Sequence, residues 1–282
     1  PVMIAPSMNV HMFENPVVQK NMSSLEKLGH EIITPEEGYL ACGYTGKGRL
    51  PEPKRLVEEA VKKLCRKDLK GKKILITAGP TRESLDPVRF LTNHSSGKMG
   101  YALAKAAAYR GAEVKLISGP TDLEVPLGVE IEYVKTAEEM KLKVFKEFNS
   151  ADITIMAAAV ADYRPKKIND KKIKKSETSL TLELERTTDI LKELGNRKQN
   201  SQLLIGFAAE SENLLNNAQK KLKQKQADYI IANDISDKKI GFGSDKNQVT
   251  ILGEESRTKL PLLAKEKIAN KIYDYITGAE RK

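Results

Sequence analysis

Residues 91–111, LTNHSSGKMGYALAKAAAYRG, carry a group of side chains suited to binding an anion. Ser95, Ser96 and Gly97 stand where an alanine-rich helix is expected to begin, shortly after the apolar strand KKILITAG (72–79). The N-terminus of a helix offers free backbone N–H groups and about half a positive charge, so this arrangement predicts a phosphate site. The serines are equally typical of a plain N-cap, with the glycine only easing helix packing.

Further polar segments follow expected strands, at the edge of a parallel sheet where ligands bind. One is the charged loop of ITAGPTRESLDPVRF (76–90). Another, MAAAVADYRPKKINDKKIKKS (156–176), joins a strand of small residues to a lysine-rich run. Such a run is usually a solvated surface, yet here it also fits a cover over a triphosphate, because phosphoryl chemistry requires neutralised charge. IGFAAE (205–210) and the Gly-rich loop of IANDISDKKIGFGSDKNQVTIL (231–252) are further candidates, and the latter is equally typical of a turn.

The elements that must position these residues alternate between strand and helix from residue 72 onward, which predicts a parallel, doubly wound, Rossmann-like α/β domain over 72–282. Residues 1–66 form a separate N-terminal piece, and the polar KDLKG (67–71) is expected to be a linker. The alternating strand 179–185 is expected to leave the main sheet as a hairpin or arm. The expected strands are 2–6, 31–35, 72–79, 112–119, 129–135, 151–160, 179–185, 202–210, 227–234 and 248–253. The expected helices are 53–66, 97–110, 136–149, 187–199, 211–226 and 260–278.

The composition excludes several classes of protein. The 282 residues are 40% hydrophobic and 30% charged, as in globular chains, and no apolar run reaches the roughly 18–20 residues of a membrane span. Two cysteines without a CxxC pair and three scattered histidines argue against a disulfide scaffold or a metal centre. A net charge of +10 suits small polyanions, whereas the lack of Trp argues against nucleic acid. A cytoplasmic protein without nucleic-acid or membrane partners is expected.

Taken together in this order and spacing, NHSSGKMG, AAVADYRP, KIKK, GFAAE, IANDIS and GSDKNQVTIL resemble the phosphopantothenate–cysteine ligase family over about residues 70–275. APSMNVHMFENP (5–16) and GYLACGYTGKGRLPEP (38–53) resemble the end of the flavin-dependent phosphopantothenoylcysteine decarboxylase family, which implies a flavodoxin-like segment before the ligase domain. In bacteria these are the two halves of a bifunctional enzyme of coenzyme A biosynthesis. The flavin-binding strands and catalytic histidine of the first half are not matched here, so an N-terminally truncated chain with a complete ligase half is expected.

The resemblance implies a reaction in two steps. The carboxylate of 4′-phosphopantothenate attacks the α-phosphate of CTP, giving an acyl-cytidylate and pyrophosphate, and the amine of cysteine then displaces CMP to form an amide. Mg²⁺ is expected to bridge phosphate oxygens, and its protein ligands cannot be read from the sequence. The decarboxylase half uses FMN to decarboxylate the product.

The resemblance also implies roles for particular residues. Lys172 would meet the triphosphate and the developing charge, and Arg89 would hold phosphopantothenate or its intermediate. The amide of Asn93 would donate to the acyl oxygen of the cytidylate, while Ser95 and the helix start cradle a phosphate. Thr188 replaces a proline that the family usually has. The implied nucleotide-binding residues are Ala158, Ala159, Asp162, Lys172, Thr188, Asp189, Ile190, Leu191, Phe207, Lys221 and Lys225.

In the N-terminal piece, Asn9 would bind the pantothenoylcysteine substrate and Cys42 would be the proton donor of the decarboxylase. The family further suggests a homodimer of the ligase domain, through an arm at 166–186, and larger assemblies of the bifunctional protein. Two other functions stay open. A Rossmann-type NAD(P) oxidoreductase shares the α/β pattern but not the GxGxxG fingerprint, and the basic charge fits a non-catalytic module that binds nucleic acid or flavin.

Overall fold

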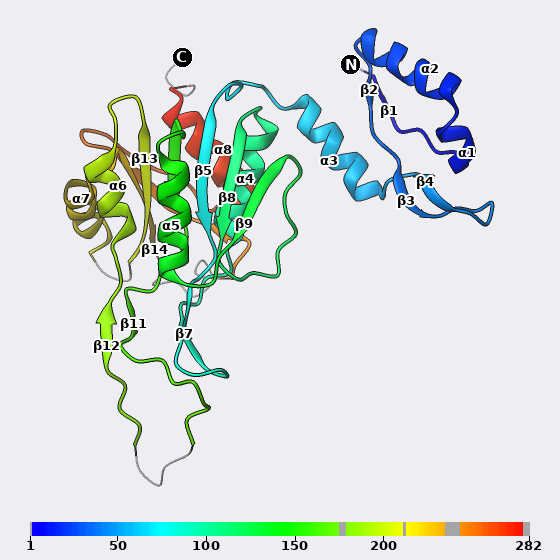
Figure 1. The fold of residues 1–282 in the computed structure, drawn as a ribbon. Helices are drawn as coiled ribbons and strands as arrows, with labels where there is room; N and C mark the ends of the chain where they lie inside the picture. Colours follow the sequence, from blue (N-terminus) through cyan, green and yellow to red (C-terminus); the bar gives the residue numbers. More distant parts are fainter. Residues whose placement is uncertain (1, 175–178, 211–212, 235–242, 279–282) are drawn as a thin grey trace. The chain divides into compact units, whose positions relative to one another are not determined.

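The structure, a computed structural model, describes all residues except 1, 175–178, 211–212, 235–242 and 279–282 (Figure 1). The chain divides into two compact units, Pro1–Arg66 and Lys67–Lys282, which are described separately. The second unit contains the residues of the expected Rossmann-like domain.

An eight-stranded sheet forms the centre of the second unit. Its parallel strands are β5 (Lys73–Ala78), β8 (Glu113–Ser118), β9 (Val129–Tyr133), β10 (Ile153–Met156), β13 (Leu203–Glu210) and β14 (Tyr229–Asp234). β16 (Val249–Leu252) and β17 (Arg257–Lys259) extend the sheet antiparallel beyond β14. The order β9-β8-β5-β10-β13-β14 is the doubly wound 3-2-1-4-5-6 order, so the expected fold class is confirmed. The order reverses between β5 and β10, and ligands of this fold bind in the crevice beyond those strand ends.

Helices cover both faces of this sheet (Figure 1). On one face are α5 (Ala137–Phe148), α6 (Ile190–Arg197) and α7 (Leu214–Lys225), and on the other are α4 (Lys98–Tyr109) and α8 (Lys265–Ile276). The core on the first face contains Met140 and Phe148 of α5, Leu194 of α6 and Leu222 of α7. Burial on both faces explains why the strands are apolar throughout rather than alternating.

Two small hairpins extend from the end of the sheet that carries the strand ends β5 and β10 (Figure 1). β6 (Arg82–Ser84) pairs with β7 (Phe90–Thr92), and β11 (Tyr163–Pro165) pairs with β12 (Leu184–Arg186). β12 therefore leaves the main sheet as expected, although it begins at Leu184 rather than at residue 179. A third short pair joins β15 (Lys246–Asn247) to β18 (Leu263–Ala264). Strands of two or three residues are too short to show a period, so only β12 was anticipated.

The first unit contains two short parallel strands, β1 (Met3–Ile4) and β2 (Glu31–Ile32), and an antiparallel hairpin. The hairpin consists of β3 (Glu36–Tyr39) and β4 (Thr45–Arg49). The helices are α1 (Val10–Phe13), α2 (Pro16–Lys27) and α3 (Pro53–Leu64). Only α3 and the two parallel strands were expected. No residue of α2 is fully buried, although Val18, Met22 and Leu25 lie at helical spacing and are half-buried.

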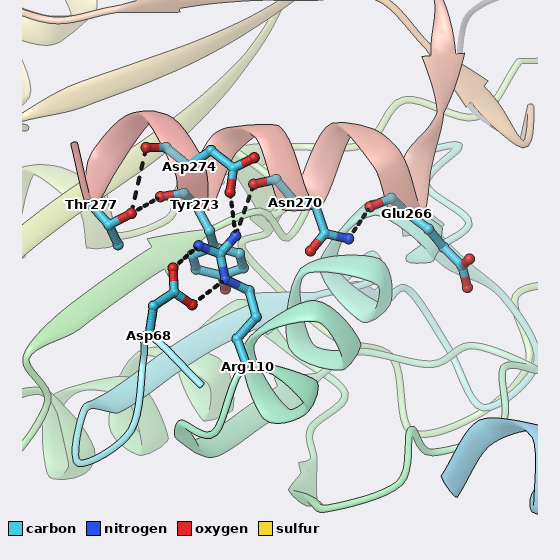
Figure 2. A network of polar contacts seen from close by, with 7 residues as sticks. All are labelled: Asp68, Arg110, Glu266, Asn270, Tyr273, Asp274 and Thr277. Carbon is cyan, nitrogen blue, oxygen red and sulfur yellow. Dashed lines mark hydrogen bonds and ion pairs between the residues drawn. The ribbon is translucent and has the colours of Figure 1, made fainter. Parts of the chain in front are cut away.

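Residues 67–71 are not the linker that the sequence predicts, because they pack onto the second unit. Leu69 is 1% exposed, and its N–H donates to the carbonyl of Arg110 at 3.1 Å. Arg110, at the end of α4, is 2% exposed. Its guanidinium binds both oxygens of Asp68 at 2.9 and 2.5 Å and Asp274 of α8 at 2.7 Å (Figure 2). The boundary therefore falls before Lys67.

This buried guanidinium predicts a large effect on stability. Arg110→Met should cost about 3–5 kcal/mol, because it removes the buried guanidinium that binds the carboxylates of Asp68 and Asp274. Denaturant unfolding followed by far-UV circular dichroism measures the loss. Arg197→Met is the matched control, since Arg197 is exposed and pairs with Glu193 at 3.4 Å, and it should cost less than about 1 kcal/mol. Equal losses in the two variants would contradict the role given to Arg110.

Candidate functional site

The candidate site begins where β5 and β10 continue to pair beyond the sheet. The N–H of Ala159 donates to the carbonyl of Gly79 at 2.9 Å, and the N–H of Thr81 donates to the carbonyl of Ala159 at 3.3 Å. Gly79 is required at this turn because its φ is +74° and an added Cβ would lie 2.9 Å from Thr121. The two strand ends thus form a backbone ribbon along the crevice.

Two buried threonines fix this ribbon. The hydroxyl of Thr77 accepts the N–H of Ala158 at 3.1 Å, and the hydroxyl of Thr81 accepts the N–H of Ala161 at 3.0 Å. Ala158 and Ala159 remain half-buried, so a flat ligand can approach the backbone there. The threonines were missed from sequence because a Thr at a strand end gives no sign of the partner it will meet.

Asn93 joins the loop before α4 to the same ribbon. Its side-chain Nδ2 donates to the carbonyls of Ala159 and Val160 at 3.1 and 3.2 Å. Both amide protons are therefore engaged by the backbone. Donation to a substrate oxygen, the role implied by the sequence, requires that at least one of these bonds be exchanged.

The start of α4 is open, as an anion site requires. Gly97 is its N-cap, with φ of +75° and no side-chain capping bond, so the alternative that Ser95 or Ser96 caps the helix is wrong. The hydroxyl of Ser95 instead accepts the N–H of Gly97 at 3.3 Å. An added Cβ on Gly97 would lie 2.7 Å from Thr121, so only glycine fits. The first N–H groups of α4 thus remain available to an anion.

Lys98, the first residue of α4, binds the neighbouring loop at residues 243–245. Its Nζ binds the carbonyl of Gly243 at 3.0 Å and the carboxylate of Asp245 at 2.6 Å. This ion pair lowers the pKa of Asp245. Lys265 of α8 donates to the carbonyl of Ser244 at 2.5 Å, and burial lowers its pKa. Most of the Gly-rich loop proposed for the rim, residues 235–242, lies outside the described residues.

A second charged group brings together residues of α6, α7 and β13. Asp189 caps α6 by accepting the N–H of Lys192 at 3.1 Å, and it pairs with Lys225. Burial raises the pKa of Asp189, but the hydrogen bonds from Lys225 and Lys192 and the charges of Lys225 and Lys221 together outweigh burial, and the net shift of the pKa is downward. Lys221, one turn earlier on α7, donates to the carbonyl of Phe207 at 3.0 Å. Four of the implied nucleotide-binding residues therefore meet at one place.

Two implied nucleotide-binding residues need correction. Ile190 and Leu191 are 4% and 8% exposed and belong to the core between the sheet and its helices. Leu191 lies directly on Gly206, where an added Cβ would be 2.5 Å from its methyl group. Their side chains are therefore not free to line a nucleotide pocket, and only their backbone groups at the start of α6 can contribute.

The remaining implied residues of this unit lie on or near the hairpins. Asp162 is exposed just before β11, and its carbonyl accepts the N–H of Thr187 at 3.0 Å. Thr188 is exposed between β12 and α6, and Lys172 is exposed in the arm that joins β11 to β12. Arg89, before β7, is exposed, and its guanidinium pairs with buried Asp86 at 2.7 Å.

In the first unit, Asn9 and Cys42 meet across 33 residues of chain. The Nδ2 of Asn9 lies 2.9 Å from the Sγ of exposed Cys42, which is in the β3–β4 loop. Asn9 also caps α1, since its Oδ1 accepts the N–H of His11. Gly48 allows this approach, because an added Cβ would lie 2.1 Å from the carbonyl of Met8. The structure thus supplies a polar side chain and a thiol at one point.

The described residues also line a cavity of about 350 Å³ between the start of α7 and the strands β16 and β17. Asn213, Thr250, Arg257 and Lys259 are among its lining residues, and none of the implied site residues is. The candidate site therefore lies outside this cavity. In the described part of the chain, no three His, Cys, Asp or Glu side chains group as a metal site. No described helix has the length and apolarity to cross a membrane.

Comparison with known proteins gives matches over both units. Residues 69–279 match the family described as "DNA/pantothenate metabolism flavoprotein C-terminal domain", and residues 1–65 match the family described as "Flavoprotein". The chain is 49% identical to the coenzyme A biosynthesis bifunctional protein CoaBC of Bacillus subtilis (strain 168), over all of this chain and 70% of the relative.

Two further matches agree with these. A cysteine/cysteine sulfinic acid decarboxylase from an unknown prokaryotic organism is 44% identical, over 95% of this chain and 77% of its own length. The crystal structure of the C-terminal domain of a CoaBC protein is 47% identical, with a TM-score of 0.65. The alignment covers 76% of this chain and 98% of that domain.

The close contact between Gly97 and Thr121 at the start of α4 predicts that Gly97→Ala destabilises the protein more than Gly111→Ala. Gly97→Ala and Gly111→Ala alter the two ends of the same helix, both at positive φ, so each costs about 1–2 kcal/mol of backbone strain. Only Gly97→Ala adds a clash with Thr121, because the nearest neighbour of an added Cβ at Gly111 is 3.5 Å away. Denaturant unfolding should show a further loss of about 1–3 kcal/mol for Gly97→Ala. Equal losses would mean that the helix start adjusts without cost.

Proposed function

The chain belongs to the family of coenzyme A biosynthesis bifunctional proteins, and on this premise we propose that its second unit joins 4′-phosphopantothenate to cysteine with CTP. Ligase and decarboxylase roles in coenzyme A biosynthesis follow from membership in the family. One observation supports the ligase proposal most directly. The uncapped start of α4 and the Ala158–Ala159 backbone, which is hydrogen-bonded to Gly79 and Thr81, follow the carboxyl ends of the neighbouring parallel strands β5 and β10.

In the first step, a carboxylate oxygen of 4′-phosphopantothenate forms a bond to the α-phosphorus of CTP, and the bond to pyrophosphate breaks. Negative charge accumulates on the transferred phosphate, so fixed N–H groups and cations stabilise the transition state. We assign Lys172 to the triphosphate and the start of α4 to a phosphate group. Lys221, Lys225 and Phe207 are assigned to the nucleotide.

In the second step, the amine of cysteine attacks the acyl carbon of the cytidylate, loses a proton and displaces CMP. Asn93 is assigned to the acyl oxygen, because it lies on the ribbon where the acyl group would sit. Its two bonds to backbone carbonyls hold the amide ready, and one of them is exchanged for the substrate. Mg²⁺ would be held mainly by phosphate oxygens and water, which is how nucleotide-bound Mg²⁺ is usually ligated.

The first unit is proposed to serve the flavin-dependent decarboxylase, with Asn9 binding substrate and Cys42 donating a proton. The start of α2 does not offer open N–H groups to the phosphate of FMN, because the side chain of Asn15 already caps the helix. The start of α3 has no side-chain capping bond, and Pro53 removes only one of its free N–H donors. Flavin absorbance of the purified chain tests whether this unit binds flavin.

A homodimer formed through the β11–β12 arm is part of the proposal, as is a cytoplasmic setting consistent with two free cysteines.

The rival NAD(P) oxidoreductase is less well supported. In dinucleotide-binding sheets the first strand turns directly into a helix through a glycine-rich loop. Here residues 79–97, including the β6–β7 hairpin, lie between β5 and α4. Titration with NADPH tests this rival.

Two variants should fail at different steps. With CTP, Mg²⁺ and phosphopantothenate but no cysteine, the wild type and Asn93→Ala should both release about one pyrophosphate per site. After cysteine is added, only the wild type should turn over, because Asn93→Ala stalls at the cytidylate. Lys172→Ala should slow the first release about 10²–10³-fold, the usual cost of one transition-state donor.

Lys146→Ala and Asn149→Ala are the matched controls, because both residues are exposed at the end of α5 and lie outside the proposed site. Full rates in both Lys172→Ala and Asn93→Ala would show that the site assignment is wrong. No pyrophosphate release by the wild type would refute the ligase proposal itself.

A further inference from the structure

The segment that carries Lys172 is held on both sides by the β6–β7 loop. The N–H of Asn169 donates to the carbonyl of Leu85 at 3.0 Å. Four residues later, the N–H of Ile173 donates to the carboxylate of Asp86 at 3.1 Å, and its carbonyl accepts from Arg89 at 2.6 Å. The backbone N–H and the backbone carbonyl of Ile173, next to Lys172, are thus both bound by the Asp86–Arg89 ion pair.

Asp86 is the centre of this arrangement. Its side chain is fully buried, and its Oδ1 accepts the N–H groups of Val88 and Arg89, both at 2.8 Å. Its Oδ2 accepts Ile173 and the guanidinium of Arg89. Burial raises the pKa of Asp86, but the hydrogen bonds from Ile173, Val88 and Arg89 outweigh burial and hold it at about 2. Asp86 is therefore ionised throughout the neutral range.

Apolar burial holds little of this part of the arm, in which Ile173 is half-buried. Ile168 is exposed, as are the lysines from Lys166 to Lys172. Polar contacts to the β6–β7 loop are what fix its register. In an extended chain a slip of one residue turns a side chain to the opposite side, so a loose register would move Lys172 away from the nucleotide.

We propose that Asp86, together with Arg89, is a positioning residue that fixes the backbone of Ile173 and thereby places Lys172 for the first step of the reaction. This proposal rests on the ligase function proposed above. It also gives Arg89 a different role from the one implied by the sequence. Arg89 acts through the arm, because its guanidinium is already divided between Asp86 and the carbonyl of Ile173.

The first test is limited proteolysis by trypsin, which does not depend on any activity. Asp86→Asn keeps the shape of the side chain but removes its charge and one acceptor oxygen, so the arm should detach more often. Cleavage after Lys171, Lys172 and Lys174, followed by mass spectrometry, should become about tenfold faster, the cost of one charge-assisted hydrogen bond. Asp170→Asn is the matched control, because Asp170 is an exposed Asp in the same arm, and it should leave cleavage unchanged.

The second test is kinetic. In pyrophosphate release, Asp86→Asn should lower kcat about tenfold with a smaller change in the KM for CTP, because a misplaced Lys172 is lost mainly from the transition state. In the Lys172→Ala background the same substitution should have no further effect, since residues acting as one unit are not additive. A general loss of folding would lower kcat equally in the wild-type and the Lys172→Ala backgrounds.

The outcomes separate the two proposals. Wild-type cleavage of the arm in Asp86→Asn, or an equal loss of kcat in both backgrounds, would overturn the positioning role. A wild type that releases no pyrophosphate would refute the ligase function, while the trypsin result would still decide whether Asp86 holds the arm. If Asp86→Asn does not fold, Arg89→Lys replaces it, because the shorter reach of a single ammonium loses the bond to Ile173 and should give the same two results.

Discussion

The pairing of β5 with β10 beyond the end of the sheet is the constraint on which the candidate site depends. Ordinary parallel strands separate at their carboxyl ends and leave a crevice. Here Gly79 and Ala159 continue the backbone hydrogen bonding between the two strands. The hydroxyls of Thr77 and Thr81 accept further N–H groups of the segment after β10. The strand ends therefore form a fixed backbone edge, and the side chain of Asn93 is hydrogen-bonded to that edge.

Two kinds of force hold the second unit together, and they act in different places. Apolar burial between the sheet and its helices fixes the strands, with the buried guanidinium of Arg110 joining α4 to α8 and to Asp68 (Figure 2). At the opposite end, the hairpins leave apolar side chains such as Val88, Phe90 and Leu184 exposed. They are held by hydrogen bonds and ion pairs, of which the Asp86–Arg89 pair is the most buried. The exposed pairs can be exchanged at low cost, whereas breaking the pair of buried Asp86 is costly.

At several glycines an added Cβ would clash with a neighbouring segment, and these positions mark where two backbones approach each other. At Gly97 and Gly79 the obstacle is the same residue, Thr121, so the turn after β5 and the start of α4 are fitted against one surface. The arrangement brings an uncapped helix start close to the backbone ribbon.

The sequence by itself determined the fold class of the second unit, because alternating apolar runs and helical periods are local properties. Each of its six main strands and its helices was predicted to within a few residues, and the motif at residues 93–100 predicted an anion site at the start of α4. The short hairpins and the packing of residues 67–71 were not predictable, since two or three residues carry no period and burial depends on distant partners.

Only the tertiary structure decided what individual site residues contact. Ile190 and Leu191 were assigned to the nucleotide from a motif, but the neighbouring strand at Gly206 buries their side chains. Arg89 was assigned to a substrate, yet its partners are Asp86 and the carbonyl of Ile173, 84 residues away. Asn93 meets carbonyls 66 and 67 residues away. A residue's type shows which bonds it can form, whereas the folding of distant segments decides which of those bonds are already occupied.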